Sequence, residues 1–138
     1  MGNNTVYIYE EGACRGDEFS NKIKVDKDLL LTTLRSVYTK VVELKRVHKD
    51  DENAFEDAFE EMMDAELSTY TDYTLVEVLH AMVREDYFCN ILNFLNSNIA
   101  KLEKNEAFVL NREESTIGVA FTAKDAVLAC HDFDEEGW

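Results

Sequence analysis

Proline is absent from this chain of 138 residues, and glycine occurs only five times. Without proline, a Gly/Ser-rich stretch or a repeat, the sequence shows no linker, and we expect a single domain over residues 1–138. Five scattered glycines cannot supply the Gly-rich loop that cradles a nucleotide phosphate. No apolar stretch approaches the ~18 residues of a membrane-spanning helix.

Cysteine is also scarce, and its three copies, Cys14, Cys89 and Cys130, are an odd number at wide spacing. This pattern is typical of free thiols in a reducing cytoplasm, and it lacks the ligand pairs that a zinc site requires. The first residues contain neither a basic region nor an apolar run, so we expect no signal peptide. We therefore predict a cytoplasmic protein (in the host-cell cytoplasm if the chain is phage-encoded) that binds no metal or cofactor.

Basic residues are outnumbered, because 14 Lys and Arg stand against 29 Asp and Glu, for a formal net charge of −15. Such a chain repels phosphate, so we expect no direct binding to nucleic acid or to an anionic membrane. The charge is unevenly distributed: residues 22–49 sum to +5, whereas residues 50–73 contain ten acids and no base. A basic partner protein is the expectation that follows.

The apolar pattern predicts an α+β fold, with about three α-helices packed on a small antiparallel β-sheet. Helices are expected from residue 26 or 28 to residue 49, over 51–67 and over 74–104, because apolar residues recur there at helical spacing. Alternating or β-branched segments predict short strands, which could pool into one sheet. These strands are expected at residues 5–9, before a turn at 10–12, and at 22–25, 107–110, 117–123 and 126–130.

The helix expected over residues 51–67 separates its apolar and acidic side chains. At 100° per residue, Phe55, Phe59 and Met62 fall on one side of it. The acids Asp57, Glu60, Glu61 and Asp64 fall on the opposite side and should face solvent. No base stands among them to relieve the repulsion, which costs about a few tenths of a kcal/mol for each like-charged pair at i and i+4.

Motifs for catalysis are missing, since no phosphate-binding loop, nucleophile elbow or zinc-protease helix pair occurs. Cys130 and His131 are neighbours, but on the strand expected over 126–130 they would point to opposite faces. The acids Asp57, Glu61 and Asp64 are similar to the carboxylates with which all-α nucleotide pyrophosphatases hold magnesium, yet no second pair repeats their spacing. We therefore expect that the protein is not an enzyme.

The acids themselves suggest a function. Carboxylates at i and i+4 lie about 6 Å apart along a helix axis, comparable in scale to the ~3.4 Å axial rise per residue of one nucleic-acid strand. We expect the protein to imitate nucleic acid and to bind a basic nuclease or defence complex. The expected partner-binding residues are Asp51, Glu52, Glu56, Asp57, Glu60, Glu61 and Asp64, with Asp134, Glu135 and Glu136 near the C-terminal end.

In its small size, net charge and acidic helix, the chain resembles phage-encoded nucleic-acid mimics, a likeness of composition and not of motif. Those proteins occupy the DNA or RNA channel of restriction enzymes or CRISPR effectors. Two alternatives use the same chemistry. One is an immunity or antitoxin protein that neutralises a basic toxin nuclease, and the other is a small acidic regulator of a host polymerase. The basic segment 22–49 bears on both, unless its cations only neutralise neighbouring acids.

Overall fold

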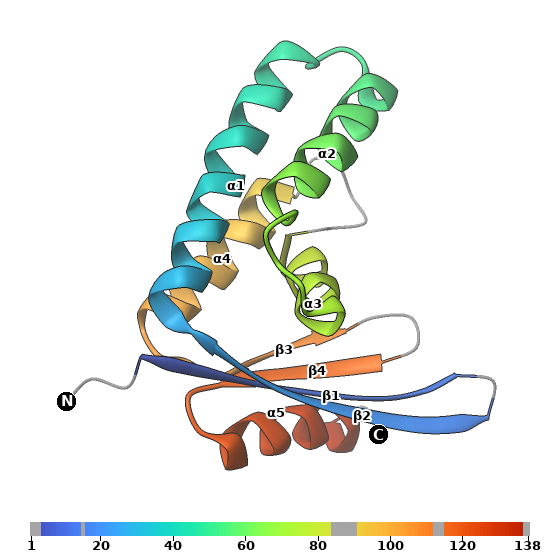
Figure 1. Ribbon diagram of the computed structural model, residues 1–138, viewed down its shortest axis with the longest axis vertical. Coiled ribbons are helices and arrows are strands. Elements are labelled where there is room, and N and C mark those ends of the chain that lie inside the picture. Colours follow the sequence, from blue (N-terminus) through green and yellow to red (C-terminus); the bar gives the residue numbers. More distant parts are fainter. Residues whose placement is uncertain (1–3, 15, 84–90, 112–114, 137–138) are drawn as a thin grey trace. The chain divides into compact units, whose positions relative to one another are not determined.

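The computed structural model describes residues 4–14, 16–83, 91–111 and 115–136 (Figure 1). These residues form a four-stranded antiparallel sheet and five helices, which confirms the predicted α+β class. The chain divides into two compact units: a sheet unit, residues 1–30 and 100–138, and a helical unit, residues 31–99. Among the described residues, no helix is both long enough and apolar enough to cross a membrane.

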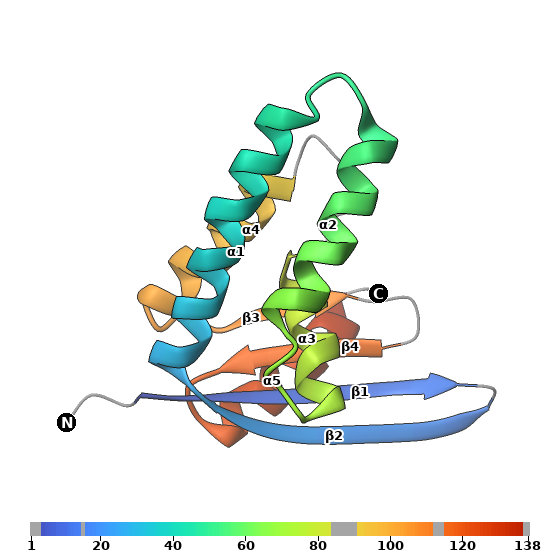
Figure 2. The same ribbon diagram turned by 45° about the horizontal axis from the view of Figure 1, so that its top comes forward.

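The sheet unit joins strands from both ends of the sequence in the order β2-β1-β4-β3. The N-terminal and C-terminal strands pool into one antiparallel sheet, as the apolar pattern predicted. Figure 2 shows the long hairpin formed by the first two strands. The strands are β1 (Thr5–Cys14), β2 (Asp17–Asp26), β3 (Phe108–Asn111) and β4 (Ser115–Ala120).

The turn expected at residues 10–12 is wrong, because β1 continues through it to Cys14. Gly12 pairs with Phe19 of β2 on one side and with Ser115 of β4 on the other. Pairing on both sides supplies ladder contacts that the turn tendency of a lone glycine does not overcome. The chain reverses instead after Cys14, where Gly16 adopts a positive φ of 86°.

The strand expected at residues 126–130 is also wrong, because this segment belongs to helix α5 (Ala123–Glu136). Thr122 marks the helix start, since its Oγ1 accepts a hydrogen bond of 3.0 Å from the Asp125 amide. Ala126 and Cys130, four residues apart, are both buried, which fits one side of a helix. Figure 1 shows α5 lying against one face of the sheet.

The helical unit contains most of α1 (Lys27–Val47) and α4 (Ile91–Glu103), with all of α2 (Glu52–Glu66) and α3 (Tyr73–Val83). One helix was expected over residues 74–104. This range contains α4 and all of α3 except its first residue, while residues 84–90 lie outside the described residues. The buried Asn98 amide donates to the Met82 carbonyl oxygen at 2.7 Å and ties α4 to α3. The helices α1 and α2 form an antiparallel hairpin (Figures 1 and 2).

Close packing of α5 on β4 depends on Gly118. A Cβ atom at this position would lie 2.0 Å from the Ala126 carbonyl oxygen, which is backbone and cannot rotate away. We predict that Gly118→Ala lowers the free energy of unfolding by about 3 kcal/mol, because α5 must move off the sheet to admit the methyl group. Urea denaturation followed by circular dichroism measures the loss.

Gly16→Ala is the matched control. It adds the same methyl group where no atom lies within 4 Å, so only the positive φ opposes it. The expected loss is about 1 kcal/mol. Equal losses at Gly118 and Gly16 would contradict the close approach of α5 to β4.

Candidate functional site

Helix α2 begins at an acidic cap. The side chain of Asp51 accepts a hydrogen bond of 3.0 Å from the Ala54 amide while its own backbone is extended. Glu52 occupies the first turn, where the helix dipole favours a negative charge. Both side chains are exposed, as a partner-binding role requires, and both also help to start the helix.

The apolar side of α2 follows a row of residues spaced by four. Phe55, Phe59 and Met63 are buried, and the rings of Phe55 and Phe59 stack with their centroids 5.9 Å apart. The sequence placed Met62 on the side of Phe55 and Phe59, where it is half-buried, but the fully buried methionine is Met63. Steps of four form one ridge along a helix, whereas the step of three to Met62 leaves that ridge.

The acidic side of α2 lies opposite this ridge. Asp57, Glu61 and Asp64 are exposed and make no hydrogen bond or ion pair with other described residues; we call these three the α2 acidic face. Glu56 is exposed beside it. Glu60 is half-buried and engaged in an interaction, so it does not belong to the face. The expected exposure is therefore confirmed for three of the four central acids.

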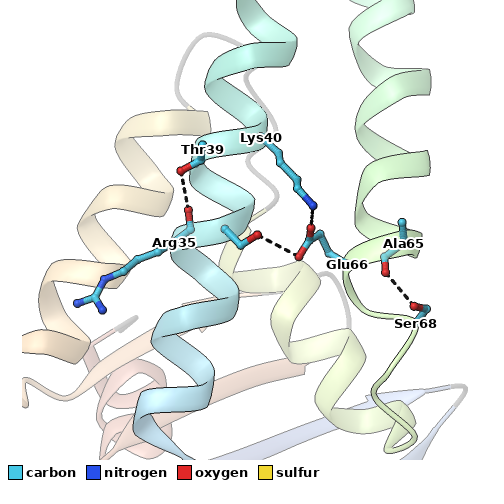
Figure 3. A network of polar contacts seen from close by, with 7 residues as sticks. Arg35, Thr39, Lys40, Ala65, Glu66 and Ser68 are labelled. Atoms are coloured by element: carbon cyan, nitrogen blue, oxygen red, sulfur yellow. Dashed lines mark hydrogen bonds and ion pairs between the residues drawn. The ribbon is translucent and has the colours of Figure 1, made fainter.

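One acid of α2 is neutralised from α1. Lys40 forms an ion pair with Glu66, and Ser36 Oγ donates to the same carboxylate at 3.3 Å (Figure 3). The Glu66 side chain is 14% exposed, so it lies between the two helices and not on the α2 acidic face. Burial of this kind favours a paired carboxylate over an unpaired one.

A second cation of the basic segment 22–49 also serves a neighbouring acid. Arg46 donates from two guanidinium nitrogens to Glu43 on the same helix. This hydrogen bond lowers the pKa of the Glu43 carboxyl. The internal role considered for the basic segment is thus seen for Lys40 and Arg46.

The three C-terminal acids of the expected set, Asp134, Glu135 and Glu136, belong to helix α5. Their side chains lie outside the part of the molecule that the structure describes. Of the ten residues expected to bind a partner, the structure therefore brings seven together on α2 and at its start.

A polar cluster that the sequence did not indicate links β1 to α5. Glu11 Oε2 accepts a hydrogen bond of 3.1 Å from the Tyr9 hydroxyl and lies 2.7 Å from His131 Nε2. The rings of Tyr9 and His131 meet edge to face. Alternation along β1 places Tyr9 and Glu11 on one face. Glu11 and His131 are separated by 120 in the sequence numbering, so no local pattern indicates their contact.

Cys130, the neighbour of His131, contacts a different group. Its buried thiol donates to the Thr116 carbonyl oxygen at 3.4 Å, whereas His131 is exposed and turned to Glu11. The two neighbours diverge as expected, although they do so on a helix and not on a strand. Among the described residues, no three His, Cys, Asp or Glu side chains group closely enough to hold a metal ion.

Burial raises the pKa of the Tyr9 phenol above its ordinary value of 10.0, and the hydrogen bond to Glu11 raises it further. The neutral phenol therefore stabilises the fold, and this contribution is lost as the pH rises through the raised pKa. We predict that the free energy of unfolding falls less above about pH 10 in Tyr9→Phe than in the wild type. Urea titrations of both proteins at several alkaline pH values measure the difference, and parallel curves would contradict it.

Comparisons of the chain with protein-family models, with curated proteins and with solved structures found no match. Its function is therefore inferred from the charges and contacts of the described residues.

Proposed function

We propose that the protein is an acidic inhibitor that imitates nucleic acid and blocks the basic nucleic-acid-binding surface of a bacterial nuclease or defence complex, as anti-CRISPR and anti-restriction proteins of phages do. The supporting observation is the α2 acidic face. Asp57, Glu61 and Asp64 are exposed, and no described cation pairs with them. The proposed role is binding without catalysis, in the cytoplasm of the host cell.

The distribution of cations on α1 supports this proposal. Lys40 and Arg46 are directed to Glu66 and Glu43, and neither pairs with the α2 acidic face. A solvated acidic helix usually intersperses bases at i+4 to reduce repulsion, and α2 has none. The face therefore keeps its charge available for a cationic surface outside the chain.

Such a face has two effects on a basic partner. The electric field of this face adds to the field of the net charge of −15, and the combined attraction speeds the encounter with a positively charged channel. On contact, the carboxylates accept hydrogen bonds from Arg and Lys side chains that otherwise hold phosphate oxygens. Both effects weaken as salt screens the charges, because the Debye length falls by about half between ~0.1 and ~0.5 M salt.

The proposal is tested with a triple variant, Asp57→Lys, Glu61→Lys and Asp64→Lys. Wild-type and variant proteins are immobilised, bacterial lysate is passed over both at low salt, and proteins retained by the wild type alone are identified by mass spectrometry. We expect a basic nucleic-acid-binding protein among them, with an affinity for the variant at least ~100-fold weaker, because three attractive charges become repulsive. The melting temperature should stay within about 4 °C of the wild type, since exposed charges contribute little to stability.

The matched control changes three exposed acids outside α2 and β2, Asp28, Glu106 and Asp125, to Lys. It shifts the net charge by the same amount, so a general charge effect would weaken capture by both variants equally. The proposal predicts capture near the wild-type level for the control. Equal loss in both variants, or full capture by the α2 variant, would refute the assignment of binding to α2.

A further inference from the structure

Among the described residues, β2 forms a long edge of the sheet. β2 extends over ten residues, Asp17–Asp26, and stands at the end of the strand order, with β1 as its partner on one side. No described strand pairs with its other side (Figure 2). The opposite edge strand, β3, is only four residues long. A long edge presents a row of backbone donors and acceptors to another strand, whereas a short edge resists such pairing.

The sequence of β2 is self-complementary in one antiparallel register. When Asn21 lies opposite Asn21 of a second copy, each Lys24 faces a Glu18, and each Ile23 faces a Phe19. A two-fold axis makes every such pair occur twice. Residues 17–25 of the two copies then pair along nearly the whole strand.

The side chains of these pairs lie on the correct faces and are accessible. Alternation places Glu18 and Lys24 on one face of β2, and Phe19 and Ile23 on the other. Glu18 and Lys24 are exposed, and Phe19 and Ile23 are only half-buried. Pairing would therefore cover apolar surface on one face and join opposite charges on the other.

The two neighbouring registers that keep the same faces of β2 together pair its side chains less favourably. A shift by two residues in one direction places Lys22 on the axis against its own copy and Asp26 against Glu18. A shift by two in the other direction keeps one ion pair, Lys22 with Glu18, but sets Phe19 against Asn21 and Ile23 against Asp17. Of these three registers, the one centred on Asn21 is alone in pairing Lys24 with Glu18 and Ile23 with Phe19, and it has no like charges directly opposite each other, which would destabilise a sheet. Its one charged-against-apolar pair, Asp17 with Val25, lies at the end of the paired segment.

We propose that β2 pairs with β2 of a second copy of this chain in the register centred on Asn21, forming a two-fold dimer with a continuous eight-stranded sheet. Lysine on an edge strand ordinarily discourages pairing. Here Lys24 meets a carboxylate, so the same residue selects one partner and one register. The surface is independent of the α2 acidic face, which belongs to the helical unit.

Charge reversal tests the register. Sedimentation velocity over about 1–200 μM should show a monomer–dimer equilibrium for the wild type. Glu18→Lys and Lys24→Glu should each weaken dimerisation about tenfold or more, because each substitution creates two like-charged pairs. An equimolar mixture of the two single variants should dimerise like the wild type, because every cross-strand pair is then opposite in charge. The double variant should recover for the same reason.

Lys22→Glu is the matched control, since it changes the net charge as Lys24→Glu does but faces Ser20 of the second copy. Its effect should stay within about threefold of the wild type. A wild-type chain that remains monomeric at the highest concentration would overturn the proposal. So would a dimer that both single reversals leave unchanged, or a mixture of the two variants that does not associate.

Discussion

Burial of one side of α2 is the constraint on which its acidic surface depends. The helix holds seven carboxylates and no base within fifteen residues. Its four like-charged pairs at i and i+4 cost roughly 1–2 kcal/mol together. Burial of Phe55, Phe59 and Met63 stabilises the folded state by about 1.5–3 kcal/mol for each side chain. Apolar packing therefore exceeds the repulsion, and the helix keeps its charge without internal cations.

Neutralisation within the helical unit is selective. Glu66 is the acid that lies between α1 and α2, and it receives both Lys40 and Ser36. An unpaired carboxylate there would carry a desolvation cost, whereas an exposed one on the α2 acidic face remains hydrated. Stability thus requires a cation at Glu66 and none at Asp57, Glu61 or Asp64. We interpret the unrelieved charge as a feature that serves a partner.

The sequence predicted most of the fold where one local signal dominated. The β-branched and aromatic residues at 5–9 and the alternation at 22–25 located part of β1 and part of β2. The helical spacing located α1 and α2 to within about two residues at each end. The prediction from sequence failed where a tertiary contact outweighed the local signal. Gly12 suggested a turn but pairs with strands on both sides, and residues 126–130 suggested a strand but belong to α5, which buries Ala126 and Cys130. Neither cross-strand pairing nor helix–sheet contact is visible in a short window of sequence.

The candidate site was predicted in outline and corrected in detail. Exposure of Asp57, Glu61 and Asp64 followed from helical periodicity, which is a local property. The engagement of Glu60 and the shift from Met62 to Met63 depend on how α2 packs, which periodicity does not specify. The cluster of Tyr9, Glu11 and His131 joins the two ends of the chain, so no local pattern could indicate it.

The central claim is that the α2 acidic face takes the place of nucleic acid on a basic partner. Competition tests it most directly: the captured partner is titrated with this protein at several fixed concentrations of the nucleic acid that the partner binds. Mutual exclusion predicts that the apparent Kd rises in proportion to the nucleic-acid concentration once this exceeds the Kd of the nucleic acid. An apparent Kd that stays constant, with a ternary complex of partner, nucleic acid and this protein, would contradict the claim.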